Sequence, residues 1–201
     1  MCINAYNLID GMDWLCSGLS IISVLTFAIC GLLKNTSYYS ILFLLSASIA
    51  GFMVWNKPDA KIFLGDGGST TLGFIIAVIP VLNPFDYLFN CSQILICLLI
   101  SSIPVIDVFS AIIRRLKAKK SIFAPDKEHL HHKLLNLGFS KKKIIFYIFS
   151  IQIYIGLLIV VSQYTTRNIS TILALSFFVV LSFLFLLIHY VNLYINRIKQ
   201  N

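Results

Sequence analysis

Long apolar stretches constrain the fold of this chain more than any other feature of its sequence. A helix needs about 20 mostly apolar residues to cross a bilayer. The stretches that approach this length are Trp14–Leu33, Tyr38–Trp55, Thr71–Leu88, Cys91–Ile113, Ile144–Tyr164 and Ile169–Tyr194. Only 12% of the residues are charged, about half the fraction that soluble domains carry. The sequence therefore predicts an all-α, polytopic transmembrane helix bundle of about six spans, forming one integral-membrane domain over residues 1–201.

The placement of the basic residues predicts the orientation of this bundle. An even number of spans puts both termini on one side of the membrane, and basic residues favour the cytoplasmic side. With cytoplasmic termini, all of the 16 Lys and Arg residues except Lys34 and Arg167 lie in cytoplasmic segments. The net charge of +8 is thus a topology signal, and no nucleic-acid partner is expected. Membrane lipid is the predicted partner of the apolar surface instead.

One long polar segment, residues 114–143, interrupts the apolar pattern on the predicted cytoplasmic face. A connection of this length in a compact protein is usually functional or disordered. Its apolar residues argue that it is ordered; they include Phe123, Pro125, Leu130, Leu134 and Phe139. We expect residues 114–143 to form a cytoplasmic loop that carries histidines.

The first cluster of polar residues, from Asn4 to Asp13, comes just before the first apolar stretch. Asn4, Asn7, Asp10 and Asp13 follow one another at intervals of three, which would place them on one face of a helix. Asn and Asp also favour helix caps, and Gly favours turns. The pattern alone leaves a functional site and simple capping equally open.

The second cluster lies between the second and third stretches and reads FLGDGGSTTLG, from Phe63 to Gly73. A glycine-rich turn that enters a helix exposes backbone N–H groups, which bind phosphate at the positive end of the helix dipole. Asp66 is a candidate Mg²⁺ ligand, because Mg²⁺ takes one or two carboxylates together with phosphates and water. The alternative is a tight turn with Ser69 as the helix N-cap.

The third cluster contains three histidines within four residues, His129, His131 and His132. The spacing matches no standard zinc motif. Basic neighbours such as Arg115 favour an anion-binding role, against the alternative of a solvated loop that touches anionic lipid. Asp107 lies in the preceding apolar stretch, where an ionisable residue is a functional candidate. Pairing of Asp107 with a nearby arginine remains equally open.

Four short motifs in this order resemble the polyprenyl-phosphate N-acetylhexosamine-1-phosphate transferases. The family's NAxNLxDGxDGL element corresponds to NAYNLIDGMDWL, GDxGS to GDGGS, PVxD…RR to PVIDVFSAIIRR, and PDxxHxHH to PDKEHLHH. The resemblance covers Asn4 to about Ser140, and the histidine motif is most similar to the undecaprenyl-phosphate N-acetylglucosamine branch. The family is made of multi-pass helical enzymes in the bacterial inner membrane, with their active face in the cytoplasm.

The resemblance implies transfer of N-acetylglucosamine-1-phosphate, or a related N-acetylhexosamine-1-phosphate, from a UDP-sugar to undecaprenyl phosphate. UMP is released, and the product starts cell-envelope polysaccharides such as O-antigen of lipopolysaccharide. The implied cofactor is Mg²⁺, with Mn²⁺ as the alternative. The resemblance assigns catalytic roles to Asp10 and Asp13, metal binding to Asp66 and Asn7, and substrate binding to the remaining residues. These are Asn4, Gly65, Gly68, Ser69, Arg115, His129, His131 and His132.

Two departures from the family pattern lead to further expectations. Trp14 stands where the family usually has Gly, and a bulky ring there would alter the turn or crowd the site. The family's aspartate pair, which precedes these motifs, has no counterpart, so the resemblance implies a C-terminal half with little activity alone. A homodimer or a missing N-terminal half would complete it. The alternative is an inactive fragment or a UDP-sugar-binding membrane subunit.

Overall fold

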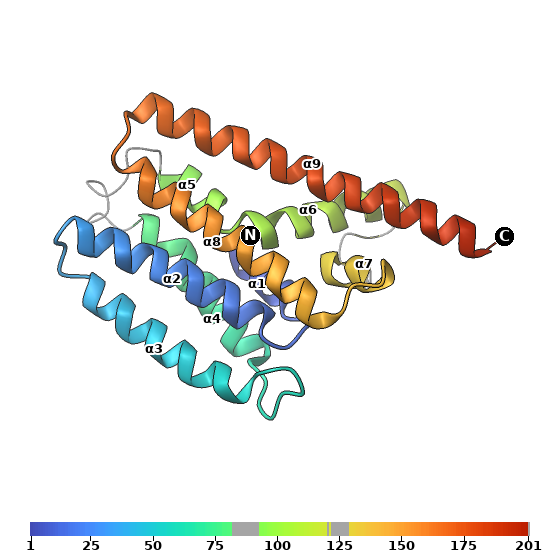
Figure 1. The fold of residues 1–201 in the computed structure, drawn as a ribbon, viewed down its shortest axis with the longest axis horizontal. Coiled ribbons are helices and arrows are strands. Elements are labelled where there is room, and N and C mark those ends of the chain that lie inside the picture. The colour runs from blue at the N-terminus through green and yellow to red at the C-terminus, as the bar shows by residue number, and fades with distance from the viewer. Residues whose placement is uncertain (82–92, 120, 122–128, 201) are drawn as a thin grey trace.

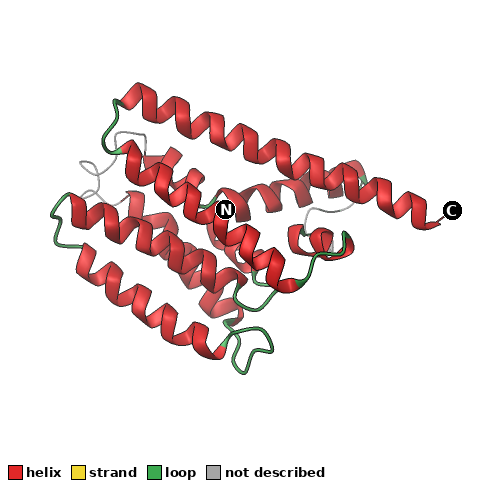
Figure 2. Cartoon of the chain, in the orientation of Figure 1, coloured by secondary structure: helices red, strands yellow, loops and turns green. Residues whose placement is uncertain are grey.

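The computed structural model describes residues 1–81, 93–119, 121 and 129–200 of the chain. Every regular element in these ranges is a helix (Figure 2), which confirms the predicted all-α fold. The α-helices are α1 Cys2–Ile9, α2 Leu15–Leu33, α3 Tyr39–Trp55, α4 Gly65–Val78, α5 Gln93–Ile100, α6 Ser102–Lys117, α7 Leu130–Asn136, α8 Lys141–Ser162 and α9 Arg167–Gln200. A 3-10 turn, η1 Ile79–Val81, extends α4.

Fewer helices have full membrane-spanning length than the predicted six. Among the described residues, α2, α8 and the Arg167–Tyr194 part of α9 are long and apolar enough to cross a bilayer. Helices α5 and α6 form a fourth span if the pair is counted as one. Helix α3 and the α4–η1 unit are shorter apolar helices. The predicted third stretch begins inside α4, and its end, residues 82–88, lies outside the described residues.

The predicted fourth span is broken in the structure, because α5 and α6 meet at an angle of 78°. Pro104, close to the start of α6, explains the break: its ring collides with the carbonyl four residues earlier in a continuous helix. That carbonyl belongs to Ile100, and it accepts a hydrogen bond from Gln152 Nε2 on α8 at 2.8 Å. A side chain of a neighbouring helix thus satisfies the backbone group that the break releases.

Helix α2 lies at the centre of the bundle, and 72% of its apolar stretch is buried. It packs between α3 and α8 (Figure 1). Two glycines allow α2 and α8 to approach closely: Gly18 faces the Phe149 ring, and Gly156 faces the Thr26 side chain. Small residues serve this purpose in membrane bundles, where close backbone packing replaces the hydrophobic effect. Helix α9 lies on the outside of the bundle, and only 17% of its apolar stretch is buried.

The bundle has two ends with different polarity. The α2–α3 and α8–α9 connections lie at one end, while the α3–α4 connection and α7 lie at the other (Figure 1). Lys34 and the start of α9 at Arg167 belong to the first end. Lys57, Lys61 and the first turn of α8 belong to the second. The structure therefore separates the basic residues as the sequence predicts, and α1 and α7 place all three polar clusters near the basic end.

Residues 114–143 are not one continuous loop. The segment begins in the last turn of α6, includes α7 and ends in the first turn of α8. Phe123 and Pro125, which were expected to order the segment, lie outside the described residues. Asn192 Nδ2 on α9 donates to the Lys133 carbonyl of α7 at 3.1 Å. Helix α7 is therefore anchored to the bundle.

Candidate active site

The first polar cluster spans the end of α1 and the turn that follows it. The prediction that Asp10 and Asp13 share a helix face is wrong, because α1 ends at Ile9 and α2 begins only at Leu15. Asp10 is the C-cap residue of α1, and Asp13 lies in the turn. The simple capping alternative is not supported either, since neither α1 nor α2 has a side-chain hydrogen bond at its N-cap. The turn instead presents the two carboxylates at the helix end.

The two asparagines of this cluster differ in their surroundings. Both lie on α1, where the spacing of three residues places them on one face. Asn4 is exposed and Asn7 is half-buried. The Asn7 side chain contacts the second polar cluster through Ser69. Of the two asparagines, Asn7 is therefore the one that joins two elements of the candidate site.

Residues 10–14 form the acidic turn, which carries Asp10 and Asp13. Trp14 ends this turn in a left-handed backbone conformation, with φ of 68°. This conformation favours glycine, which explains physically why glycine suits the position in the family. Here the indole Nε1 donates to the Met53 carbonyl of α3 at 2.7 Å, and the backbone N–H donates to Asn56 Oδ1 at 3.1 Å. The ring is thus bound to α3, and the backbone keeps the left-handed turn expected for glycine.

The glycine-rich motif forms the beginning of α4. Gly65 starts the helix with φ of 65°, a conformation that glycine adopts without strain. The alternative that Ser69 caps this helix is wrong, because the N-cap residue is Leu64 and Ser69 lies inside α4. The buried Ser69 hydroxyl lies 2.8 Å from Asn7 Oδ1 and 3.0 Å from the Gly65 carbonyl. This contact joins the first and second clusters.

A second close contact fixes α4 against α1. A Cβ atom at Gly73 would lie 2.9 Å from Tyr6 Cβ and 3.1 Å from Ile3 Cα, so a glycine is required for the two helices to approach this far. Gly68, by contrast, faces the Leu64 side chain on its own helix. The α1–α4 packing holds the N-terminal turn of α4 beside the end of α1.

Three carboxylates gather where α1 and α4 meet. The pKa of Asp10 is raised from 3.8 to about 6, chiefly by burial and then by the negative charges of Asp66 and Asp13. Asp66 and Asp13 therefore lie close enough to Asp10 to repel its negative charge. Asp66 itself is exposed, in the first turn of α4. The arrangement concentrates negative charge where a cation would relieve the repulsion.

The histidine cluster is brought to the acidic turn by α7. The His131 ring lies directly against Gly11, where an added Cβ would be 2.7 Å from His131 Cε1. His131 is 2% exposed, and neither of its ring nitrogens has a hydrogen-bond partner among the described residues. The pKa of His131 is lowered to about 4, chiefly by burial and then by His132. His131 is therefore a neutral imidazole beside the acidic turn.

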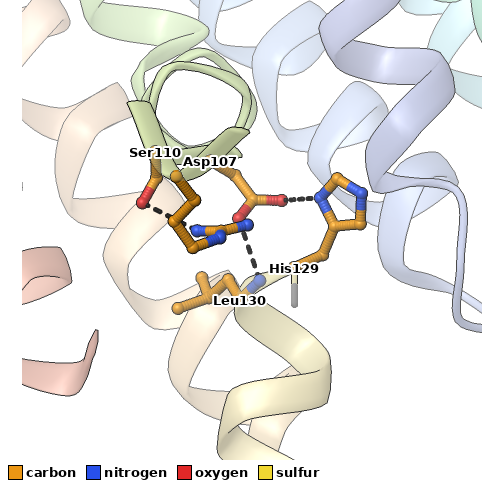
Figure 3. Close-up of polar contacts among 5 residues, drawn as sticks. Asp107, Ser110, His129 and Leu130 are labelled. Atoms are coloured by element: carbon orange, nitrogen blue, oxygen red, sulfur yellow. Dashed lines mark hydrogen bonds and ion pairs between the residues drawn. The ribbon is translucent and has the colours of Figure 1, made fainter. Parts of the chain in front are cut away.

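The other two histidines have different surroundings. The His132 ring is exposed and lies 4.2 Å from the His131 ring, centre to centre. His129 is buried, and its Nδ1 lies 2.9 Å from Asp107 Oδ2 (Figure 3). Asp107 Oδ1 accepts the backbone N–H of Leu130 at 2.9 Å. The question left open for Asp107 is thus answered in part: the carboxylate binds the histidine cluster.

The structure joins some of the predicted site residues and leaves others apart. It connects Asn7 with Ser69, Asp10 with the charges of Asp66 and Asp13, and His131 with the acidic turn through Gly11. The Gly65 carbonyl contacts Ser69, and the His132 ring lies against the His131 ring. Asn4, Gly65 and His132 are exposed, while Gly68 and Arg115 are half-buried. Arg115 lies in the last turn of α6.

Two residues important to this geometry were not singled out from the sequence. Gly11 was expected only to form a turn, but it makes room for the His131 ring. Asn56 is buried and accepts from the Trp14 backbone and from Ser17 Oγ, while its Nδ2 donates to the Ile62 carbonyl. The position of Gly11 inside the first motif was the available signal. The sequence contains no such signal for Asn56, because the role of this residue depends on contacts between distant segments.

The oxygen donors near the end of α1 suit the Mg²⁺ that the family resemblance implies. Within the described ranges, no three His, Cys, Asp or Glu side chains converge to hold a metal ion by themselves. Mg²⁺ does not require such a group, since it keeps several waters and is bound by one or two carboxylates together with substrate phosphates. The crowded carboxylates around Asp10 and the oxygen of Asn7 fit such an ion.

Comparisons with known proteins show the family of the chain. The family model described as glycosyl transferase family 4 matches residues 1–83. A probable undecaprenyl-phosphate N-acetylglucosaminyl 1-phosphate transferase of Bacillus subtilis is 39% identical over 149 residues, which are 74% of this chain and 41% of that protein. A decaprenyl-phosphate N-acetylglucosaminephosphotransferase of Mycobacterium tuberculosis is 35% identical over 168 residues, 73% of this chain and 41% of that protein.

The Escherichia coli K12 undecaprenyl-phosphate alpha-N-acetylglucosaminyl 1-phosphate transferase is 33% identical over 149 residues, 70% of this chain and 40% of that protein. The chain thus spans about 40% of the length of the curated relatives it matches. Its helices are those of a membrane protein. The family model, these relatives and the clustered motifs agree, and the chain belongs to the polyprenyl-phosphate N-acetylhexosamine-1-phosphate transferases of glycosyl transferase family 4.

Proposed function

We propose that this protein transfers N-acetylglucosamine-1-phosphate, or a related N-acetylhexosamine-1-phosphate, from a UDP-sugar to undecaprenyl phosphate. A phosphate oxygen of the lipid attacks the β-phosphorus of the UDP-sugar. The bond between that phosphorus and the bridging oxygen breaks, and UMP leaves with the bridging oxygen. The product is a lipid-linked sugar diphosphate, which would start a cell-envelope polysaccharide such as O-antigen of lipopolysaccharide.

One observation carries the proposal: three motifs that are distant in the sequence meet at one end of the bundle. The Ser69–Asn7 contact joins α4 to α1, and the His131–Gly11 contact joins α7 to the same turn. Phosphoryl transfer depends mostly on positioning and on electrostatic stabilisation of phosphate oxygens. A cluster of carboxylates, exposed backbone N–H groups and histidines is suited to these two tasks. The relatives are named for the same kind of transfer.

The acidic residues have complementary roles in this proposal. Asp66 and Asn7 would hold Mg²⁺, which supplies positive charge against the diphosphate. Asp10 and Asp13 would shape the pocket from the acidic turn. The raised pKa of Asp10 supports a role in which this carboxyl accepts or releases a proton near neutral pH, because catalytic groups are most effective when their pKa lies near the working pH.

The remaining polar residues would bind the diphosphate and the sugar. The N-terminal turn of α4 presents free backbone N–H groups at the positive end of the helix dipole, which favours phosphate oxygens. Neutral His131 can donate a hydrogen bond from one ring nitrogen and accept one at the other. Its lowered pKa keeps it in this form at neutral pH. Exposed His132, exposed Asn4 and the Arg115 guanidinium would contact substrate from the rim.

The orientation of the protein belongs to the same proposal. The basic end of the bundle would face the cytoplasm of a bacterial inner membrane, because basic residues favour that side. UDP-sugars would then reach the acidic turn directly from the cytoplasm. The phosphate of the polyprenyl lipid would enter from the membrane, at the level of the first turn of α4.

Transfer in membranes that carry the full chain tests the proposal. The host should lack its own transferase of this class. Labelled N-acetylglucosamine-1-phosphate and Mg²⁺ are supplied with undecaprenyl phosphate, and lipid-linked product is measured. Asp66→Asn is the test variant, and the exposed Asp59→Asn on the α3–α4 connection is the matched control. We expect only weak Mg²⁺-dependent transfer by the chain alone and stronger transfer when the N-terminal half of a relative is supplied with it. The stronger transfer should fall by at least about a hundredfold in Asp66→Asn, as loss of a key electrostatic group does, and persist in Asp59→Asn.

Binding of UDP-N-acetylglucosamine, measured on the same preparations, separates the outcomes. Binding without transfer, even when the N-terminal half of a relative is supplied, would contradict the enzymatic proposal and favour a UDP-sugar-binding membrane subunit. Absence of both binding and transfer would contradict the proposed substrate as well. Transfer that is equally strong in Asp66→Asn would remove Asp66 from the metal site.

A further inference from the structure

We propose that Asp107 is a positioning residue that fixes α7, and therefore His131, against the acidic turn. The inference rests on the proposed function for its catalytic consequence, but its structural part stands on the contacts alone. Asp107 lies on α6 and is 2% exposed. It uses one carboxylate oxygen for His129 and the other for the Leu130 backbone N–H (Figure 3). One side chain thereby holds two consecutive residues of another element.

Helix α7 needs such a contact to keep its place. It has only seven residues, and isolated helices of this length are unstable in water. Its N-cap residue, His129, forms no capping hydrogen bond with its own side chain. The Asp107 carboxylate takes over this task from a neighbouring helix, and its negative charge interacts favourably with the positive end of α7. The beginning of α7 is therefore fixed by α6.

His131 links the α7 segment that Asp107 holds to the acidic turn. His131 follows one residue after Leu130, and the His129 and His131 rings are nearly parallel, with their planes 6° apart and their centres at 6.2 Å. On its other side the His131 ring lies against Gly11. No hydrogen bond of its own ring holds His131 among the described residues. Its position therefore depends on where α7 begins, and Asp107 determines that point.

Two substitutions separate the contributions of the carboxylate. Asp107→Ala removes both hydrogen bonds. Asp107→Asn removes the charge and keeps an oxygen that can accept the Leu130 N–H. Asp59→Asn is the matched control, since it removes an exposed carboxylate from the α3–α4 connection. The full chain is reconstituted in lipid nanodiscs, and hydrogen–deuterium exchange is followed for the peptides of α2, α7 and α8.

We expect the α7 amides to exchange roughly ten- to a hundredfold faster in Asp107→Ala, as follows from the loss of hydrogen bonds to a charged group. A smaller increase is expected in Asp107→Asn, and none in Asp59→Asn. Exchange in α2 and α8 should stay unchanged. An unchanged α7 in Asp107→Ala, or equal acceleration in all three helices, would overturn the positioning role. If Asp107→Ala does not insert, unchanged α7 exchange in Asp107→Asn would overturn it.

The catalytic consequence has its own readout. In Asp107→Asn we expect kcat/KM for UDP-N-acetylglucosamine to fall by about tenfold or more, while Mg²⁺ dependence is retained, because the carboxylates of the acidic turn are untouched. Loosened α7 with unchanged kcat and KM would overturn the positioning role. If the unsubstituted chain shows neither transfer nor UDP-sugar binding, the proposed function fails, and the exchange measurement still decides whether Asp107 fixes α7.

Discussion

At the scale of single residues, Asp10 in the acidic turn lowers the stability of the fold at neutral pH. Asp10 has a pKa of about 6 in the folded chain, against 3.8 as the ordinary value, chiefly because it is partly buried. A group whose pKa is higher in the folded state favours folding below pH 3.8, and that contribution is lost as the pH rises through about 6. At neutral pH the ionised carboxylate therefore destabilises the fold.

Asp10→Asn should remove this pH dependence. We expect the variant to be more stable than the unsubstituted chain at pH 7, by about 1–2 kcal/mol after allowance for solvent screening of a half-buried group. The difference should shrink as the pH falls from about 6 to 4. Thermal unfolding in detergent, followed by tryptophan fluorescence across this range, provides the measurement. A variant that is less stable at pH 7 would contradict the conclusion that the ionised Asp10 carboxylate destabilises the fold.

Trp14 provides a second prediction at this scale. Trp14→Gly relieves a left-handed backbone, worth about 1–2 kcal/mol. It also removes the indole hydrogen bond to Met53, worth about 1 kcal/mol, and the packing of a large ring, worth about 2–3 kcal/mol. We expect net destabilisation of about 1–3 kcal/mol in denaturant unfolding. An unchanged or higher stability would show that the ring contributes little to the α2–α3 contact.

At the scale of elements, close helix packing places the site. The contact between α2 and α8 depends on Gly18, whose Cβ position is occupied by the Phe149 ring. Gly18→Ala should destabilise the bundle by about 1–3 kcal/mol, the usual cost of overpacking. Gly51 on α3 has no atom within 4 Å of its Cβ position, so Gly51→Ala should be neutral or stabilising by up to about 1 kcal/mol.

Thermal unfolding of the two glycine variants under identical conditions checks this expectation. The same residue change in two helices of the same membrane protein then reports on packing alone. Equal stability of the two variants would mean that Phe149 moves away without loss, and that the α2–α8 contact is not tightly packed.

The elements also show why the fold was only partly predictable. Apolar length located α2, α8 and α9, because a membrane helix must satisfy its backbone internally and is read directly from composition. The break between α5 and α6 was missed, although Pro104 signalled it, because proline is tolerated in membrane helices when a neighbour compensates. That neighbour, Gln152, lies on α8 and cannot be identified by local pattern.

At the scale of the whole molecule, the separation of charge between the two ends predicts its orientation. Single cysteines placed in a cysteine-free background at Ser37, Lys57 and Tyr164 report on the two ends. We expect a membrane-impermeant maleimide to label Ser37→Cys and Tyr164→Cys in intact cells. Lys57→Cys should be labelled only after permeabilisation. The opposite pattern would place the acidic turn outside the cytoplasm and would contradict the proposed access of UDP-sugars.

The sequence by itself determined the helical class, the membrane setting, the separation of charge and the family, because apolar length, basic residues and short motifs are local properties of a chain. It also identified the three polar clusters. Only the tertiary structure decided which of their members meet: Ser69 with Asn7, His131 with Gly11, and Asp107 with His129. These pairs lie far apart in sequence. Their contacts depend on how closely α1, α4, α6 and α7 pack, and no local pattern encodes that distance.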